Sequence, residues 1–210
     1  SLDEWNVWYH SNDADAKNKP WQIAPHLLED IYNFEDALLV GSLLITILKH
    51  ADRVKIACLA QLVNVIAPIM TDEDGNAWKQ SIFFPFMQVS NYGRGTVLTP
   101  IQKAASYSSK DFENIPYLDS IAILNDEENT VTIFALNRSL EDGMKLHVNA
   151  GDFEFNTVKE ATQFAGYGMK QTNEDGKMKI AKNDKFDLTQ KELDITLAPA
   201  SWNMVRISLK

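Results

Sequence analysis

The spacing of apolar residues changes near Pro100, and this change constrains the fold more than any other feature of the sequence. From Pro25 to His50 apolar residues recur at three- and four-residue steps, which is the period of an amphipathic helix. Acidic residues crowd the start of this stretch and Lys49 lies at its end, as the helix dipole favours. The apolar run Val54–Leu59 then predicts a buried strand. This half is therefore predicted to be α/β.

Beyond Pro100 the period falls to two, which is the spacing of strands with two different faces. Residues 118–124 and 131–136 alternate in this way, and the polar loop 125–129 between them predicts a hairpin. A second tight turn is predicted at Asn173–Gly176. Further strands are predicted at Lys145–Val148, Glu160–Ala165, Leu193–Leu197 and Met204–Leu209. The second half is therefore predicted to be an all-β antiparallel sandwich or barrel, which divides the chain into domains 1–99 and 100–210.

The charge and the apolar content exclude several classes of partner. With 20 Lys and Arg against 29 Asp and Glu, the net charge is -9, so a nucleic-acid phosphate backbone is not an expected partner. The longest apolar candidate, Ala37–Leu48, is interrupted by polar residues and is too short to span a membrane. Cys58 is the single cysteine, and its place in an apolar strand predicts a small buried residue rather than a nucleophile. Residues 1–10 lack the pattern of a signal peptide.

Residues 1–10 place two carboxylates beside three aromatic rings. Asp3 and Glu4 precede Trp5, Trp8 and Tyr9. A carboxylate can attack or stabilise an anomeric carbon, and flat aromatic faces cover the apolar C–H surface of a sugar. The same composition also fits buried or interface aromatics beside two solvated carboxylates. Residue types alone leave both interpretations open.

The string Ser1–Tyr9 closely resembles the nucleophile segment of the α-L-arabinofuranosidases of glycoside hydrolase family 51. The resemblance extends over nearly the whole chain, in the order found in the family. It is carried by Leu27–Ala37, His50–Ala57, Cys58–Ile69, Phe84–Met87, Tyr92–Gly95 and Pro199–Met204.

This resemblance implies a retaining enzyme with a (β/α)8 barrel followed by a jelly-roll-like β-sandwich, so that residues 1–99 form the last β/α units of the barrel. Glu4 matches the nucleophile, at the end of the seventh strand. Gln61, at the end of the eighth strand, matches a position that hydrogen-bonds arabinose; otherwise it satisfies nearby backbone groups. Trp8 matches an aromatic beside the scissile bond, whereas Tyr9 and Trp21 are weaker matches.

A retaining glycosidase needs a second carboxyl group, roughly 5–5.5 Å from the first. The family's acid/base glutamate follows Gly-Asn, and the sequence contains no Gly-Asn-Glu; Asn173–Glu174 follows Thr172 and lies in the other predicted domain. A whole barrel takes about 250 residues. We therefore expect a C-terminal part of the enzyme that is inactive alone and needs the N-terminal part as its partner. A strand edge and the apolar helix face Ile31–Leu48 should be exposed until that part or a second copy covers them.

The resemblance further implies an exo-acting cytoplasmic enzyme, hexameric in the family, that removes arabinofuranose from arabinan, arabinoxylan or their oligosaccharides without a cofactor. No metal is expected, because His10, His26, His50 and His147 lack the spacing of metal ligands. Gly93–Gly95 is expected to be a turn. The alternative is a non-catalytic scaffold or carbohydrate-binding sandwich. A row of exposed aromatics would mark the latter, among the candidates Tyr107, Phe112, Tyr117, Phe153, Phe155, Phe164 and Tyr167.

Overall fold

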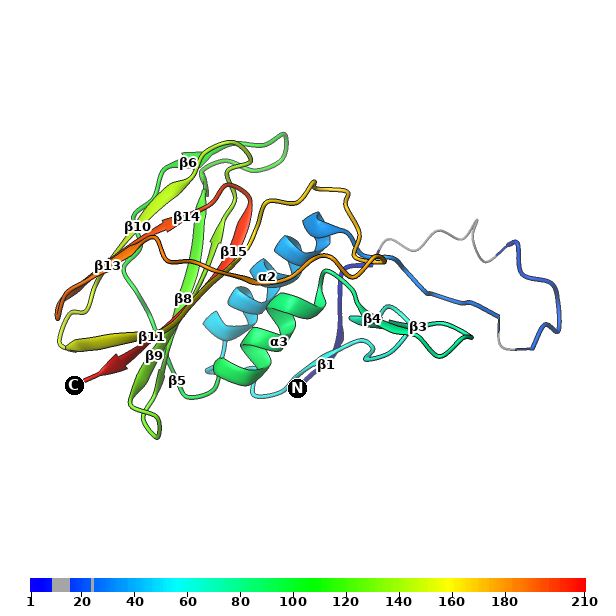
Figure 1. Ribbon diagram of the computed structural model, residues 1–210, viewed down its shortest axis with the longest axis horizontal. Helices are drawn as coiled ribbons and strands as arrows, with labels where there is room; N and C mark the ends of the chain where they lie inside the picture. Colours follow the sequence, from blue (N-terminus) through cyan, green and yellow to red (C-terminus); the bar gives the residue numbers. More distant parts are fainter. Residues whose placement is uncertain (9–15, 24) are drawn as a thin grey trace.

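A computed structural model describes residues 1–8, 16–23 and 25–210, and the regular secondary structure of these residues is mostly β. Figure 1 shows the antiparallel sheets of the second half on one side of helices α2 and α3, with β3 and β4 on the other. The elements are β1 (Leu2–Trp5), α2 (Phe34–Lys49), β2 (Ala57–Leu59), β3 (Ile69–Thr71), β4 (Ala77–Lys79), α3 (Phe83–Tyr92), β5 (Thr96–Leu98), β6 (Ser106–Tyr107), β7 (Ile115–Pro116), β8 (Leu118–Asn125), β9 (Thr130–Asn137), β10 (Met144–Asn149), β11 (Phe155–Phe164), β12 (Ala181–Lys182), β13 (Phe186–Leu188), β14 (Glu192–Leu197) and β15 (Ser201–Leu209). Within the described part of the chain, no helix combines the length and apolar character needed to span a membrane.

The second half is the predicted antiparallel sandwich. One sheet has six strands in the order β12-β11-β15-β9-β8-β5, and the other has three in the order β10-β14-β13. A continuous apolar core, which includes Ile133, Leu193 and Ile207, joins the two sheets. The predicted hairpin at 125–129 is confirmed by the antiparallel pairing of β8 with β9. The turn at Asn173 is confirmed as well, because Gly176 N donates to its carbonyl at 3.0 Å.

The six-stranded sheet is covered on both faces, and β15 at its centre shows how. Trp202 and Met204 belong to a core shared with the two helices. Val205 and Ile207 belong to the core between the sheets. Successive side chains of a strand point to opposite faces, so β15, which is covered on both sides, is buried at most of its positions. The sheet therefore joins the sandwich to the helical layer.

Helix α2 begins at Phe34, so the prediction of a helix from Pro25 was wrong in its start. Asn33 has extended backbone angles and closes a capping box, in which its side chain accepts from Asp36 N and Asp36 accepts from Asn33 N. The stretch 25–32 bonds to other loops instead, for example through Leu28 O, which accepts from Ile66 N at 2.7 Å. The apolar spacing of this stretch is that of a helix, but its backbone groups form hydrogen bonds with other loops instead of with each other.

The apolar face of α2 is largely buried within the chain, which corrects the expectation that this face would be exposed. Phe34, Val40 and Ile45 have no exposed surface and lie in the core shared with the sandwich. The helix approaches the sheet closely at Gly41, because a Cβ built there would lie 2.6 Å from Cε3 of Trp202. Absence of a side chain at position 41 is therefore what lets the helix reach the sheet.

Charged groups reinforce the same junction. Asp119 of β8 is 5% exposed. Its carboxylate accepts hydrogen bonds from Lys49 at 2.6 Å and Ser42 at 3.1 Å, both on α2, and from Arg138 at 2.6 Å. A buried carboxylate needs such partners to offset the loss of its hydration. The cluster therefore fixes where α2 lies along the sandwich.

Strand β2 differs from its prediction in two respects. It covers Ala57–Leu59 instead of beginning at Val54, because Val54 N still bonds to His50 O in the turn after the helix, at 2.8 Å. Cys58 is exposed and not buried, which corrects the prediction for that residue. Its neighbour Ala57 lines the cavity against the helices, so Cys58 points to the opposite face of the strand pair. Within the described residues, β1 and β2 form a sheet of these two strands alone.

We expect Gly41→Ala to lower the free energy of unfolding by about 1–3 kcal/mol, because the added methyl group overpacks the contact with Trp202. Helix propensity alone predicts the opposite sign, a gain of about 0.5–1 kcal/mol. Urea denaturation distinguishes the two. Thr46→Ala, on the exposed side of the same helix, is the control and should change stability little. A stabilising Gly41→Ala would contradict the packing argument.

Candidate functional site

Strands β1 and β2 run parallel, so their carboxyl ends meet at one edge. The register pairs Leu2 with Ala57 and Trp5 with Leu59. Just beyond the strands, Ala60 N donates to Trp5 O at 3.0 Å. Glu4 and Gln61 therefore lie on adjacent strand ends, with α2 as the connection that crosses from one strand to the next. We call this the Glu4/Gln61 edge.

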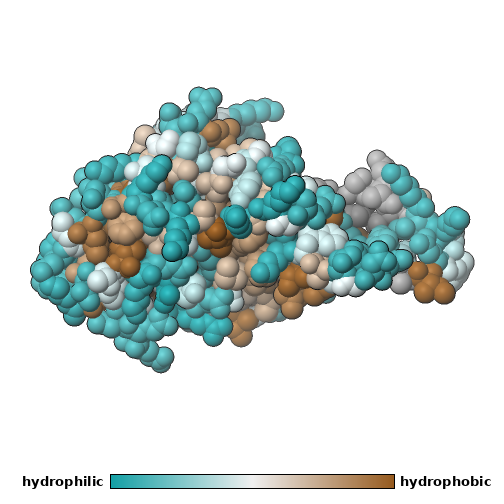
Figure 2. Space-filling view, in the orientation of Figure 1, coloured by the Kyte–Doolittle hydropathy of each residue, from teal (hydrophilic) through white to brown (hydrophobic). Residues whose placement is uncertain are grey.

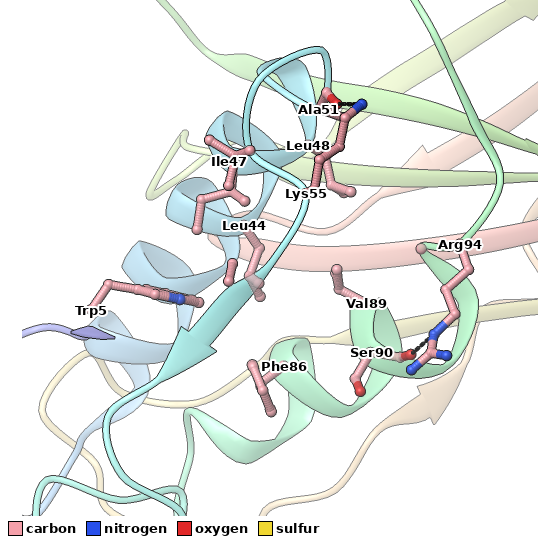
Figure 3. A pocket seen from close by; sticks show the side chains of 13 residues that line it. Trp5, Leu44, Ile47, Leu48, Ala51, Lys55, Phe86, Val89, Ser90 and Arg94 are labelled. Carbon is pink, nitrogen blue, oxygen red and sulfur yellow. Dashed lines mark hydrogen bonds between the residues drawn. The ribbon is translucent and has the colours of Figure 1, made fainter. Parts of the chain in front are cut away.

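The two faces of the strand pair have different surroundings. Trp5 points toward the helices, where it lines a cavity of about 260 Å³ with Leu44 and Phe86 (Figure 3). The rings of Trp5 and Phe86 lie 6.5 Å apart. Glu4 is exposed and is not among the residues that line this cavity. The Glu4 carboxylate is therefore not part of this cavity.

Asn6 ties the two strand ends together. Its side-chain amide donates to Ala60 O at 2.8 Å and to Ile66 O at 2.5 Å. Its side-chain oxygen accepts from Val7 N at 2.8 Å, which sets the direction of the chain after β1. Ala60 and Ile66 are both buried, at 5% and 4% exposed. One amide thus fixes the segment after β1 against the loop that carries Gln61.

A second polar residue, Gln80, organises the loops beneath this edge. It is 1% exposed. Its side-chain oxygen accepts from Tyr32 N at 2.8 Å, and its amide donates to Asp30 O and Ala67 O, both at 2.9 Å. Tyr32 in turn donates its hydroxyl to Val7 O at 3.0 Å. The segment before α2, the loop after β2 and the segment after β1 are therefore held by one buried network.

The structure places Glu4 and Gln61 on adjacent strand ends, whereas the predicted aromatic residues are exposed or lie outside the described part of the chain. Gln61 is exposed, and Trp8, four residues beyond Glu4, is 64% exposed. Trp21 is fully exposed and contributes no buried surface. Tyr9 lies outside the described residues. Glu4, Gln61 and Trp8 are thus all accessible to solvent.

Asp3 and His26 are titratable groups in the same half of the chain as Glu4. Asp3 neighbours Glu4 in β1 and is exposed as well. In the segment before α2, the hydrogen bond between His26 and Glu29, at 2.6 Å, raises the pKa of His26 above its ordinary value. Across the described ranges, no group of three or more His, Cys, Asp or Glu residues is placed to hold a metal ion.

The positioning residues were not found from the sequence. Asn6 lies inside the resembling string, but its partners are 54 and 60 residues away. Gln80 bonds to backbone groups 13 to 50 residues away. No local spacing signals such contacts, so the sequence pattern offered no means of finding either residue.

Comparison with known proteins identifies one family, the α-L-arabinofuranosidases. Residues 3–201 match the α-L-arabinofuranosidase C-terminal domain family. The chain is 50% identical, over 209 residues, to the intracellular exo-α-(1→5)-L-arabinofuranosidase 1 of Bacillus subtilis, and the match covers 99% of this chain and 42% of that relative. It is 51% identical over 212 residues to the corresponding enzyme of Halalkalibacterium halodurans, covering 100% and 42%. The chain thus spans less than half the length of these relatives.

Solved structures agree. The chain superposes on a family 51 α-L-arabinofuranosidase from Bifidobacterium longum with a TM-score of 0.88 and 34% identity, over 99% of this chain and 41% of that one. An α-L-arabinofuranosidase from Thermotoga maritima, solved as an arabinose complex, gives 0.78 at 22% identity over 97% and 42%. At that identity the second likeness concerns the fold alone.

We expect Asn6→Ala to lower the free energy of unfolding by roughly 1–3 kcal/mol, because it leaves two buried carbonyl groups without their donor. Urea denaturation measures the loss. The matched control is Asn91→Ala, which removes an exposed side-chain bond to Met87 O within one helix and should cost little. Equal losses in the two variants would contradict the role assigned to Asn6.

Proposed function

Since the chain belongs to the α-L-arabinofuranosidase C-terminal domain family, we propose that it is the C-terminal part of a retaining α-L-arabinofuranosidase. The proposed substrates are terminal α-L-arabinofuranosyl residues of arabinan, arabinoxylan or their oligosaccharides. The observation that carries the proposal is the parallel pair β1 and β2, which places Glu4 and Gln61 on one accessible edge. Two relatives are named for α-(1→5) linkages, which makes that linkage the first to test.

In the proposed mechanism the Glu4 carboxylate attacks the anomeric carbon of arabinofuranose. The bond to the leaving oxygen breaks as the bond to Glu4 forms, and an acid group protonates the leaving oxygen. Water, deprotonated by the same group, then attacks the anomeric carbon and releases Glu4 as a carboxylate. The second carboxyl group comes from the part of the enzyme outside this chain. The reaction needs two carboxyl groups and water, and no cofactor.

Gln61 and Trp8 have supporting roles in this proposal. Gln61, on the neighbouring strand end, hydrogen-bonds a sugar hydroxyl. Trp8 and Tyr9 offer aromatic faces beside the scissile bond. Gln61 and Trp8 are exposed, which supports the proposal that they contact a substrate when the N-terminal part completes the pocket.

We further propose that residues 1–99 are the last units of a (β/α)8 barrel and that residues 100–210 are its jelly-roll-like companion, with the exception of β5, which lies before residue 100 but pairs with β8 in the sandwich. Within the described residues β1 has β2 as its one sheet neighbour, so the pair has open edges. Apolar side chains of this region reach the surface: Leu2 is 37% exposed, Ile56 59% and Leu62 62%. Further barrel strands would cover these side chains. The face of the molecule seen in Figure 2 is mostly hydrophilic, with several apolar patches.

The N-terminal part of the same enzyme is accordingly the proposed partner, and the isolated chain is proposed to be inactive. The relatives from Bacillus subtilis and Halalkalibacterium halodurans are named intracellular, which supports a cytoplasmic location.

Assembly into a hexamer is proposed from the family resemblance. A carbohydrate-binding sandwich has less support, because Phe112 alone among its seven candidate aromatics is exposed.

We expect Glu4→Gln in the complete enzyme to abolish hydrolysis of an aryl α-L-arabinofuranoside, with a loss of about 10³-fold or more, because the nucleophile is gone. Mass spectrometry of the enzyme quenched during turnover should also lose the glycosylated peptide that contains Glu4. Asp3→Asn is the matched control, since it removes the neighbouring exposed carboxylate of the same strand. Unchanged turnover in Glu4→Gln would refute the assignment.

A further inference from the structure

A long segment of the sandwich crosses back over the helical layer. Residues 166–180 leave β11 and return as β12, and we call this segment the strap. Figure 1 shows it, in orange, running from the sandwich across α2 to the region where the helices meet the short strands. The strap is therefore the part of the sandwich that reaches toward the Glu4/Gln61 edge.

The strap supplies the partners of the first backbone groups of α2. Phe34 N donates to Gln171 O at 2.9 Å, and Glu35 N donates to Met169 O at 3.0 Å. Thr172 forms an antiparallel bridge with Asn33. The first N–H groups of a helix have no partner within the helix, so they need acceptors from elsewhere. The strap thus fixes the start of α2.

The strap is closed on itself at its base. The Tyr167 hydroxyl donates to Lys179 O at 3.1 Å and accepts from Lys179 N at 3.0 Å. The Tyr167 ring lies 5.5 Å from the ring of Phe34 and 5.3 Å from that of Phe164. Residues near the two ends of the strap are therefore joined to each other, and the Tyr167 ring packs against both α2 and β11.

Asn173 at the tip makes the decisive contact. It is 3% exposed. Its side-chain oxygen accepts from Met178 N at 2.6 Å, which closes the tip. Its amide donates to Lys79 O at 2.7 Å, across 94 residues of sequence. Lys79 is the last residue of β4 and directly precedes Gln80.

From Lys79 the contacts lead to the Glu4/Gln61 edge in few steps. Gln80 donates to Ala67 O at 2.9 Å. The next residue back, Ile66, accepts from Asn6 at 2.5 Å. Asn6 lies two residues beyond Glu4 and also holds the carbonyl of Ala60, which precedes Gln61. The path thus consists of side-chain hydrogen bonds and short loop segments.

We propose that the strap positions the Glu4/Gln61 edge and that Asn173 is its positioning residue. The inference rests on the proposed function, because it assigns a purpose to the edge. Asn173 acts through Lys79 and Gln80 and touches neither substrate nor reacting atoms. A small displacement at a reacting group is enough to lower turnover strongly. The sandwich would then contribute to catalysis through geometry as well as through stability.

Asn183 provides a matched control within the same sandwich. It is 2% exposed, its amide donates to Thr196 O at 2.8 Å, and its side-chain oxygen accepts from Lys185 N at 3.2 Å. It therefore has the burial and bonding of Asn173 but no link to Lys79. The test compares Asn173→Ala with Asn183→Ala in the complete enzyme, well below the lower Tm of the two.

We expect Asn173→Ala to lower kcat for an aryl α-L-arabinofuranoside about tenfold with KM little changed, and Asn183→Ala to leave both near the parent values. Asn173→Asp keeps the acceptor for Met178 N but loses the donor to Lys79 O, so its kcat should fall as well. Equal kcat in the two alanine variants, or full activity in Asn173→Asp, would overturn the proposal.

Hydrogen exchange separates this inference from the proposed function. The amides of 61–67 should exchange about tenfold faster in Asn173→Ala than in Asn183→Ala, because the loop loses its support. This readout needs no substrate and decides the matter even if Asn173→Ala is destabilised, since the control is destabilised by the same kind of loss. Failure of the parent enzyme to hydrolyse arabinofuranosides would refute the proposed function alone. Equal exchange in the two variants would refute the positioning role.

Discussion

The packing of Gly41 against Trp202 is the contact on which the rest of the structure depends. It lets α2 approach the six-stranded sheet as closely as the indole ring allows. The indole N–H is also used, because it donates to Gln88 of α3 at 2.8 Å, and Gln88 donates to Thr162 of β11 at 2.9 Å. A close-packed interior has few alternative arrangements, so both helices have a fixed place on the sandwich. Because α2 connects β1 and β2, these two strands also have a fixed position relative to the sandwich.

The groups proposed to do chemistry and the groups that hold them have opposite environments. Glu4 and Gln61 are exposed, whereas Gln80 and Asn173 are almost completely buried. Exposure leaves a carboxylate and an amide free to meet a substrate. Burial strengthens the hydrogen bonds that fix the backbone and makes their loss costly. In the complete enzyme as we propose it, the N-terminal part would close over the exposed groups and supply the second carboxyl group.

How far the sequence predicts this structure depends on how local each feature is. The hairpin between β8 and β9 was predictable because alternation and turn residues lie side by side. The Glu4 candidate followed from a string of nine residues. The start of α2 was not predictable, because Asn33 is held by a strap some 140 residues further on and the apolar spacing continues on both sides of it. The prediction that Cys58 is buried was wrong because an apolar strand pattern does not show which face of the strand is covered.

The central claim is that this chain carries the nucleophile of an arabinofuranosidase whose acid/base group lies elsewhere. The most direct measurement is hydrolysis of an aryl α-L-arabinofuranoside by the 210-residue chain, alone and after mixing with a separately produced N-terminal part of the same enzyme. The account predicts no hydrolysis by the chain alone and hydrolysis after mixing, lost when the chain carries Glu4→Gln. Hydrolysis by the chain alone, or activity after mixing that survives Glu4→Gln, would contradict it.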